Sequence, residues 1–72
     1  MLERVKRIIG KYTEVADITP ESALAADLGL SSFDLVAIIA EFEDEFEIEV
    51  PDRDVMSFVT VQDILNYLEK KA

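Results

Sequence analysis

The stretch Asp27-Leu28-Gly29-Leu30-Ser31-Ser32-Phe33-Asp34 lies where an irregular segment gives way to a long, apolar and acidic helix. Gly29 tolerates the positive φ that a tight turn needs. Serine is a preferred helix N-cap, and Ser31 followed by Asp34 has the spacing of a capping box. The stretch therefore predicts a helix start that presents a hydroxyl at its positive end, a place that suits a phosphate. Taken alone, the pattern is also that of an ordinary capped helix.

Apolar residues at helical spacing predict the other elements of the 72-residue chain. Helices are predicted over residues 2–15, 32–47, 52–57 and 61–70, with a single turn at 22–24 in the long connection. The third begins after Pro51, and the last begins at a second capping box, Thr60 to Asp63. These elements predict an all-α fold, a small antiparallel four-helix bundle of three main helices and one short helix. The length predicts one domain over residues 1–72.

The second predicted helix has two apolar faces. The core face consists of Leu35, Ile38, Ile39, Phe42 and Phe46. The other face is apolar yet predicted to be exposed, and acidic residues surround it, which is typical of a protein-binding surface. The alanines on this face are also ordinary helix formers. The predicted partner-binding residues are Phe33, Asp34, Val36, Ala37, Ala40, Glu41, Asp44 and Glu47.

The charge is unevenly distributed along the chain. Fifteen of the sixteen acidic residues lie in residues 12–69 with a single base, Arg53, whereas residues 1–11 hold four bases. So acidic a surface repels nucleic acid and anionic membranes and attracts proteins with basic patches. No apolar run reaches the roughly 18 residues of a membrane span. We therefore expect protein partners, no nucleic acid and no membrane insertion, although acidic charge can also serve solubility alone.

The absence of cysteine and histidine restricts the chemistry. It excludes disulfides, Cys/His zinc sites and nucleophiles of the Ser-His and Cys-His types. The acidic run 41–49 lacks the Asp-x-Asp-x-Asp-Gly pattern of a calcium loop. We expect no catalytic residue and no metal site. Lack of cysteine fits a reducing cytoplasm, where we expect the protein.

The order of these motifs resembles the acyl carrier protein family from about Leu2 to Leu68. The resemblance rests on Asp27-Leu28-Gly29, on Ser31-Ser32-Phe33, on the acidic helix that closes in Glu-Val-Pro, and on Thr-Val-Gln-Asp before the last helix. In that family the serine of an Asp-Ser-Leu triplet carries a 4′-phosphopantetheine arm. The resemblance implies that Ser32 is the attachment residue, with Ser31 in place of the usual Asp and Phe33 in place of the usual Leu.

The resemblance also implies a free-standing, monomeric carrier and not an enzyme. Such a carrier holds acyl intermediates as thioesters on the arm, for fatty acid or for specialised lipid or polyketide-type synthesis. Its partners would be a phosphopantetheinyl transferase and acyl-loading and acyl-processing enzymes with basic docking patches. The candidates to shelter an acyl chain are Leu35, Ile39, Phe42, Phe58 and Leu65. Two alternatives stay open: a carrier of another load, such as an aminoacyl group, and an unmodified acidic helical interaction domain for which Ser32 is dispensable.

Overall fold

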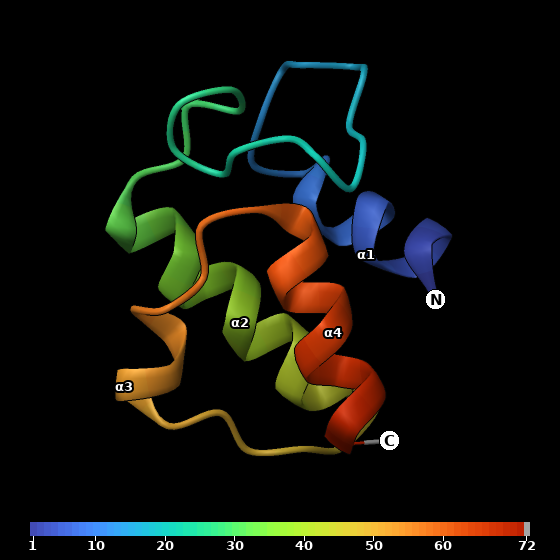
Figure 1. The fold of residues 1–72 in the computed structure, drawn as a ribbon, viewed down its shortest axis with the longest axis vertical. Coiled ribbons are helices and arrows are strands. Elements are labelled where there is room, and N and C mark those ends of the chain that lie inside the picture. The colour runs from blue at the N-terminus through green and yellow to red at the C-terminus, as the bar shows by residue number, and fades with distance from the viewer. Residues whose placement is uncertain (72) are drawn as a thin grey trace.

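The computed structural model describes residues 1–71, which form four helices. These are α1 (Leu2–Ile9), α2 (Ser32–Phe46), α3 (Asp52–Val55) and α4 (Val61–Lys71). Figure 1 shows the three longer helices grouped together, with the short α3 at one edge and the long connection of residues 10–30 at one end. The predicted all-α bundle of three main helices and one short helix is confirmed.

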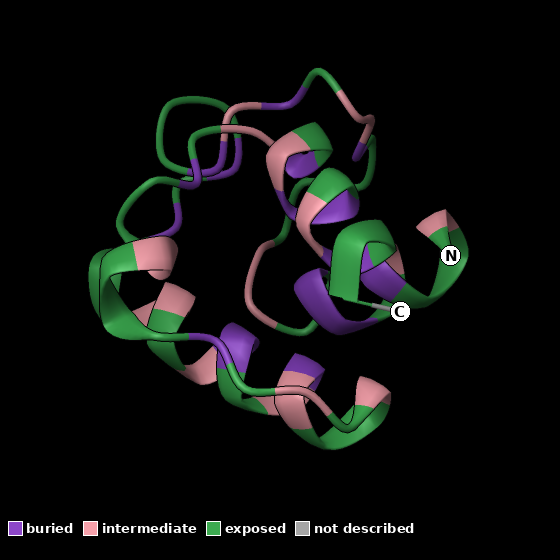
Figure 2. Cartoon of the chain, turned by 60° about the horizontal axis from the view of Figure 1, so that its bottom comes forward, coloured by how far each residue is buried: buried purple, intermediate pink, exposed green. Residues whose placement is uncertain are grey.

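A single apolar interior is built from the three longer helices and the long connection. The inward sides of the helices carry the buried residues, as Figure 2 shows. The predicted core of α2 is confirmed in its centre, since Ile38, Ile39 and Phe42 are buried, while Leu35 and Phe46 are half-buried and pack against the cluster. The other buried apolar residues are Val5, Ile8, Ile9, Ile18, Leu24, Leu28, Leu30, Val50, Phe58, Val61, Ile64, Leu65 and Leu68.

The prediction that the first helix runs to Val15 is wrong, because α1 ends at Ile9. The N–H groups of Lys11 and Tyr12 bond to carbonyl oxygens three residues earlier, at 3.2 and 2.9 Å, which is the tighter 3₁₀ pattern. Gly10 stands where the helix tightens, and a Cβ there would lie 3.0 Å from a backbone carbonyl one turn back. The chain consequently leaves the helical path, and Val15 is 40% exposed.

The remaining helix boundaries agree with prediction within two residues. α2 ends one residue early, α3 two residues early, and α4 one residue late. The single helical turn predicted at residues 22–24 does not form. That segment instead makes an isolated antiparallel bridge between Ala23 and Thr60, with the N–H of Leu24 bonded to the carbonyl of Val59 at 2.8 Å. The bridge ties the long connection to the start of α4.

The C-terminal end of α2 breaks two local preferences at one residue. Glu47, the C-cap, has φ 55° and ψ 52°, the left-handed conformation that favours glycine. Its carboxylate lies at the negative end of the helix, and the last turn of α2 contains no basic residue. The carboxylate of Glu43 stabilises the exit by accepting the N–H of Val50 at 2.9 Å. Glu47 is therefore a locally unfavourable residue in its position.

Replacing Glu47 with glycine should stabilise the fold. Glu47→Gly relieves the left-handed strain and removes the unfavourable charge, and we expect about 1 kcal/mol of added unfolding free energy. Glu49→Gly is the matched control, since it removes the same charge from an exposed residue without positive φ. Urea unfolding of both variants measures the difference. Equal effects of the two substitutions would contradict a role for the backbone conformation of Glu47.

Candidate functional site

The start of α2 is fixed by a turn followed by a capping box. Gly29 has φ 70°, and a Cβ there would meet no atom within 4 Å, so its backbone conformation and not lack of space calls for glycine. Ser31 is extended, with φ −83° and ψ 170°. Its Oγ accepts the N–H of Asp34 at 3.1 Å, and Asp34 Oδ2 accepts the N–H of Ser31 at 3.0 Å. The predicted capping box is confirmed.

The two adjacent serines therefore differ in what their hydroxyls do. Both serines are exposed, but the hydroxyl of Ser31 accepts a hydrogen bond in the capping box, whereas Ser32 is the first residue of α2. Within residues 1–71, no group hydrogen-bonds to the Ser32 hydroxyl. The hydroxyl lies in the first turn of a 15-residue helix, where N–H groups point outward and favour negative charge. Of the two serines, Ser32 is therefore the one whose hydroxyl is not engaged by another group of residues 1–71.

A mainly apolar pocket of about 560 Å³ opens beside Ser32. α2 contributes Ser32, Leu35 and Val36 to its lining, and the segment around α3 contributes the other four residues. Leu35 and Phe58 were predicted to shelter an acyl chain, and both line the pocket. The other candidates, Ile39, Phe42 and Leu65, are buried in the core and are not among the lining residues. The lining consists of Ser32, Leu35, Val36, Asp52, Val55, Met56 and Phe58.

Apart from Phe58, sequence reasoning did not assign the α3 side of this pocket. The spacing predicted a helix over residues 52–57 without placing any of its side chains in the site. The exposure of Met56, at 86%, is the kind of signal that a sequence cannot give, because a methionine at helical spacing is usually part of a core. The pocket wall depends on how α3 packs against α2, and that contact is tertiary.

The outer face of α2 carries an exposed stripe that we call the outer stripe: Phe33, Val36, Ala40, Asp44 and Glu47. Phe33, Val36, Ala40 and Asp44 follow one another at steps of three or four along the helix, so they share one face, and Glu47 is the C-cap just beyond the helical residues. Phe33 is 82% and Val36 63% exposed, as expected for the predicted exposed face of this helix. Ala37 is half-buried, and the Asp34 carboxylate is engaged in the capping box.

Two acids of α2 turn toward α1. Glu41 Oε1 lies 2.8 Å from Lys11 Nζ, and the hydroxyl of Tyr12 donates to the same carboxylate. Arg4 donates to Glu45 Oε2 from its Nη2 and Nε at 2.6 and 2.9 Å. The acidic rim that was predicted around the exposed patch is therefore incomplete on this side, because Glu41 is half-buried against the first turn after α1.

These contacts shift the acidity of the groups involved. The hydrogen bonds from Lys11 and then from Tyr12 hold the pKa of Glu41 below its usual value. The hydrogen bond between Tyr12 and Glu41 raises the pKa of Tyr12, since the Tyr12 hydroxyl donates to the Glu41 carboxylate. The Arg4 guanidinium likewise lowers the pKa of Glu45. All three groups belong to the α1–α2 contact and not to the surroundings of Ser32.

The comparisons with known proteins identify the family of the chain. The chain matches the family model described as "Phosphopantetheine attachment site" over residues 3–68. It is also similar to a solved structure from Mycobacterium tuberculosis that is assigned as an acyl carrier protein. The TM-score is 0.90 and the identity 31%, over 97% of this chain and 96% of that one. The chain belongs to the phosphopantetheine-attachment family and is an acyl carrier protein by fold.

Membership in the family settles the class of activity. The chain is a carrier and not an enzyme, and its cofactor is a covalently attached 4′-phosphopantetheine. Carriers of this family interact with a phosphopantetheinyl transferase and with acyl-processing enzymes. No helix within residues 1–71 has the length and apolar character needed to cross a membrane. In the same part of the chain, no cluster of acidic residues is arranged to hold a metal ion.

The ion pairs between α1 and α2 should make stability depend on pH in the acid range. A carboxyl whose pKa is lowered by folding stabilises the fold above its unfolded pKa, about 4.3 for Glu, and loses that contribution as the pH falls through the folded value. The Glu41→Gln and Glu45→Gln variants should therefore have lower melting temperatures than wild type at pH 7. This difference in melting temperature should shrink as the pH falls below about 4. Glu49→Gln, outside these ion pairs, is the control. Melting temperatures between pH 3 and pH 7 test the prediction, and a difference that does not change with pH would contradict it.

Proposed function

We propose that Ser32 carries the 4′-phosphopantetheine arm and that the load of the arm is an acyl group, in fatty acid or in specialised lipid or polyketide-type synthesis. The observation that supports Ser32 most directly is the division of roles between the two serines. The Ser31 hydroxyl is engaged in capping, whereas the Ser32 hydroxyl is unbonded within residues 1–71 and Ser32 lines the apolar pocket.

The surroundings of Ser32 fit the group. In the transfer, the Ser32 oxygen would bond to the phosphorus that bears pantetheine in coenzyme A, adenosine 3′,5′-bisphosphate would leave, and the hydroxyl proton would pass to the transferase. The phosphodiester that results carries one negative charge, which the first turn of α2 favours. The bound arm supplies a thiol for thioester formation, which this cysteine-free chain lacks. The chain itself supplies attachment, position and shelter.

The pocket beside Ser32 supports an acyl load over an aminoacyl load. Five of its seven lining residues are apolar, and an alkyl chain transferred there gains up to about 0.8 kcal/mol per buried CH₂. Only Asp52 brings a formal charge to the lining. An aminoacyl group would instead bring a charged ammonium, which is costly to place in apolar surroundings.

The outer stripe on α2 is the docking surface that we propose for the partner enzymes. Phe33 and Val36 provide apolar contacts next to Ser32, while Asp44 and Glu47 provide exposed negative charge farther along the same face. A partner with a basic patch beside an apolar hollow complements this arrangement, and opposite charge speeds its encounter. Asp34, Ala37 and Glu41 flank the stripe and would lie at its edge. We expect the carrier to work as a monomer in the cytoplasm and to bind no nucleic acid.

The attachment residue can be tested because the two serines are adjacent. A broad-specificity phosphopantetheinyl transferase with coenzyme A should add one arm to the wild type, at Ser32. Ser32→Ala should abolish addition, whereas Ser31→Ala should still be modified while losing about 1 kcal/mol with its cap. Intact mass gives the number of arms, and fragment mass spectrometry gives the residue.

The control follows from the helix geometry. Ser31 is the extended N-cap and its hydroxyl is held by Asp34, whereas Ser32 is the first helical residue, so an enzyme docked on α2 could not reach both hydroxyls equally. An arm on Ser31 would refute the assignment. No arm on either serine would support the alternative of an unmodified interaction domain.

The docking surface can be tested with charge and size variants of exposed residues. Asp44→Lys should slow arm addition at low salt and should make the rate less sensitive to salt, because a steering charge is reversed. Glu49→Lys is the matched reversal at an exposed acid outside α2. Phe33→Ala and Val36→Ala should weaken docking about 5- to 30-fold while the melting temperature stays near wild type.

A buried neighbour provides the contrast for these truncations. Ile38→Ala, in the core of α2, should cost about 2–5 kcal/mol of stability. If Val36→Ala unfolded the domain in the same way, the outer stripe would be part of the core. If Asp44→Lys and Glu49→Lys slowed addition equally, only net charge would matter and the stripe would not be the docking surface.

A further inference from the structure

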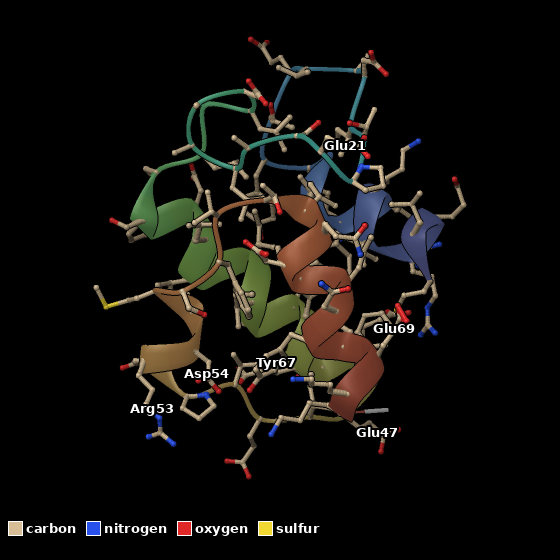
Figure 3. The ribbon with its side chains drawn as sticks, viewed as in Figure 1. Glu21, Glu47, Arg53, Asp54, Tyr67 and Glu69 are labelled. Carbon is tan, nitrogen blue, oxygen red and sulfur yellow. The ribbon has the colours of Figure 1, made fainter. Side chains whose placement is uncertain are left out.

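The pocket wall formed by α3 is weakly anchored. α3 has only four residues and none of them is buried, although Val55 is half-buried and packs against the core. Within residues 1–71, a single side-chain hydrogen bond joins α3 to another helix: the hydroxyl of Tyr67 on α4 donates to Asp54 Oδ2 at 2.8 Å. Figure 3 shows both side chains, Asp54 and Tyr67, between α3 and α4.

Tyr67 also contacts Phe58, a lining residue of the pocket in the segment after α3. Its ring packs edge-on against Phe58, with ring centroids 5.3 Å apart and planes at 77°. Phe58 is buried and lines the pocket, and Asp52 and Val55 of α3 line it as well. The ring of Tyr67 is held in turn by α4, where the ammonium of Lys71 lies 5.4 Å from its centroid. The half-buried side chain of Tyr67 therefore contacts both α3 and Phe58. These two form the wall of the pocket that lies opposite α2.

We propose that Tyr67 is a positioning residue that sets where α3 lies and thereby how wide the pocket beside Ser32 is. The proposal rests on the proposed function, in which the pocket receives the group carried on Ser32. In this proposal a short acyl chain lies between α2 and α3 without displacing α3, whereas a longer chain displaces α3 from α2. In the wild type this movement costs the Tyr67–Asp54 hydrogen bond, so Tyr67 disfavours long loads relative to short ones.

The first test needs no load. Tyr67→Phe removes only the hydroxyl and keeps the ring against Phe58. Tyr12→Phe is the matched control, since the hydroxyl of Tyr12 also bonds a carboxylate, but between the turn after α1 and α2. In the unmodified protein, amide hydrogen exchange should become about fivefold faster over residues 52–58 in Tyr67→Phe and stay unchanged there in Tyr12→Phe. A uniform rise over all helices, or no change over 52–58, would overturn the proposal.

The second test measures discrimination between loads. Wild type, Tyr67→Phe and Tyr12→Phe are each loaded with a four-carbon and a sixteen-carbon acyl pantetheine arm. The increase in melting temperature from the short to the long load should be larger in Tyr67→Phe than in wild type by several degrees, on the order of 4–8 °C. Tyr12→Phe should give the wild-type increase. An equal increase in all three proteins would overturn the proposal.

The two tests separate this inference from the proposed function. Arm addition at Ser32 is checked on the wild type before any load is compared. Failure of that addition counts against the proposed function, whereas unchanged exchange over residues 52–58, or equal load increments in arm-bearing protein, counts against the role of Tyr67.

Discussion

The reciprocal hydrogen bonds between Ser31 and Asp34 fix the first residue of α2, and the position of Ser32 depends on that register. A helix that began one residue later would place Ser32 at the N-cap, and one that began one residue earlier would place Leu30 there, so either shift would change the role of Ser32. The turn at Gly29 and the buried side chains of Leu28 and Leu30 hold the approach from the other side. Local capping and tertiary burial thus agree on one register, which places one hydroxyl in the cap and the other in solvent.

The parts of the fold that sequence predicted well are those controlled by local signals. Both capping boxes, the start of every helix and the exposed face of α2 follow from spacing and side-chain chemistry within a few residues. The end of α1 was missed because the apolar spacing continues through Tyr12, while the backbone tightens at Gly10. Periodicity reports which side chains face inward, and it does not report whether the backbone stays helical. The bridge at Ala23 was missed for a related reason, since its partner lies in the connection before α4.

The candidate site was predicted mainly where it lies on one helix. The exposed face follows from the spacing in α2 and Ser32 from the family resemblance, whereas of the pocket wall around α3 only Phe58 was predicted, because that wall depends on how α3 packs against α2 and α4. Two acids on α2 illustrate the same limit. The sequence placed Glu41 in the rim of the exposed patch, yet it bonds to Lys11, whereas Asp44 makes no ion pair within residues 1–71. Which acids face α1 is decided by how the two helices pack, and no local pattern contains that information.

The distribution of stability in this domain fits the task of a carrier. The contact between α1 and α2 has buried aliphatic side chains together with ion pairs to Glu41 and Glu45, so it forms a stable base. The side of α2 that bears Ser32 faces a four-residue helix without a buried residue, anchored by one hydrogen bond. Segments that admit and release a ligand are drawn from the least stable parts of a fold, because opening them must cost little. A carrier has to shelter its load and then yield it to an enzyme, so a weak α3 beside a firmly capped α2 lets the pocket change while the attachment residue stays in place.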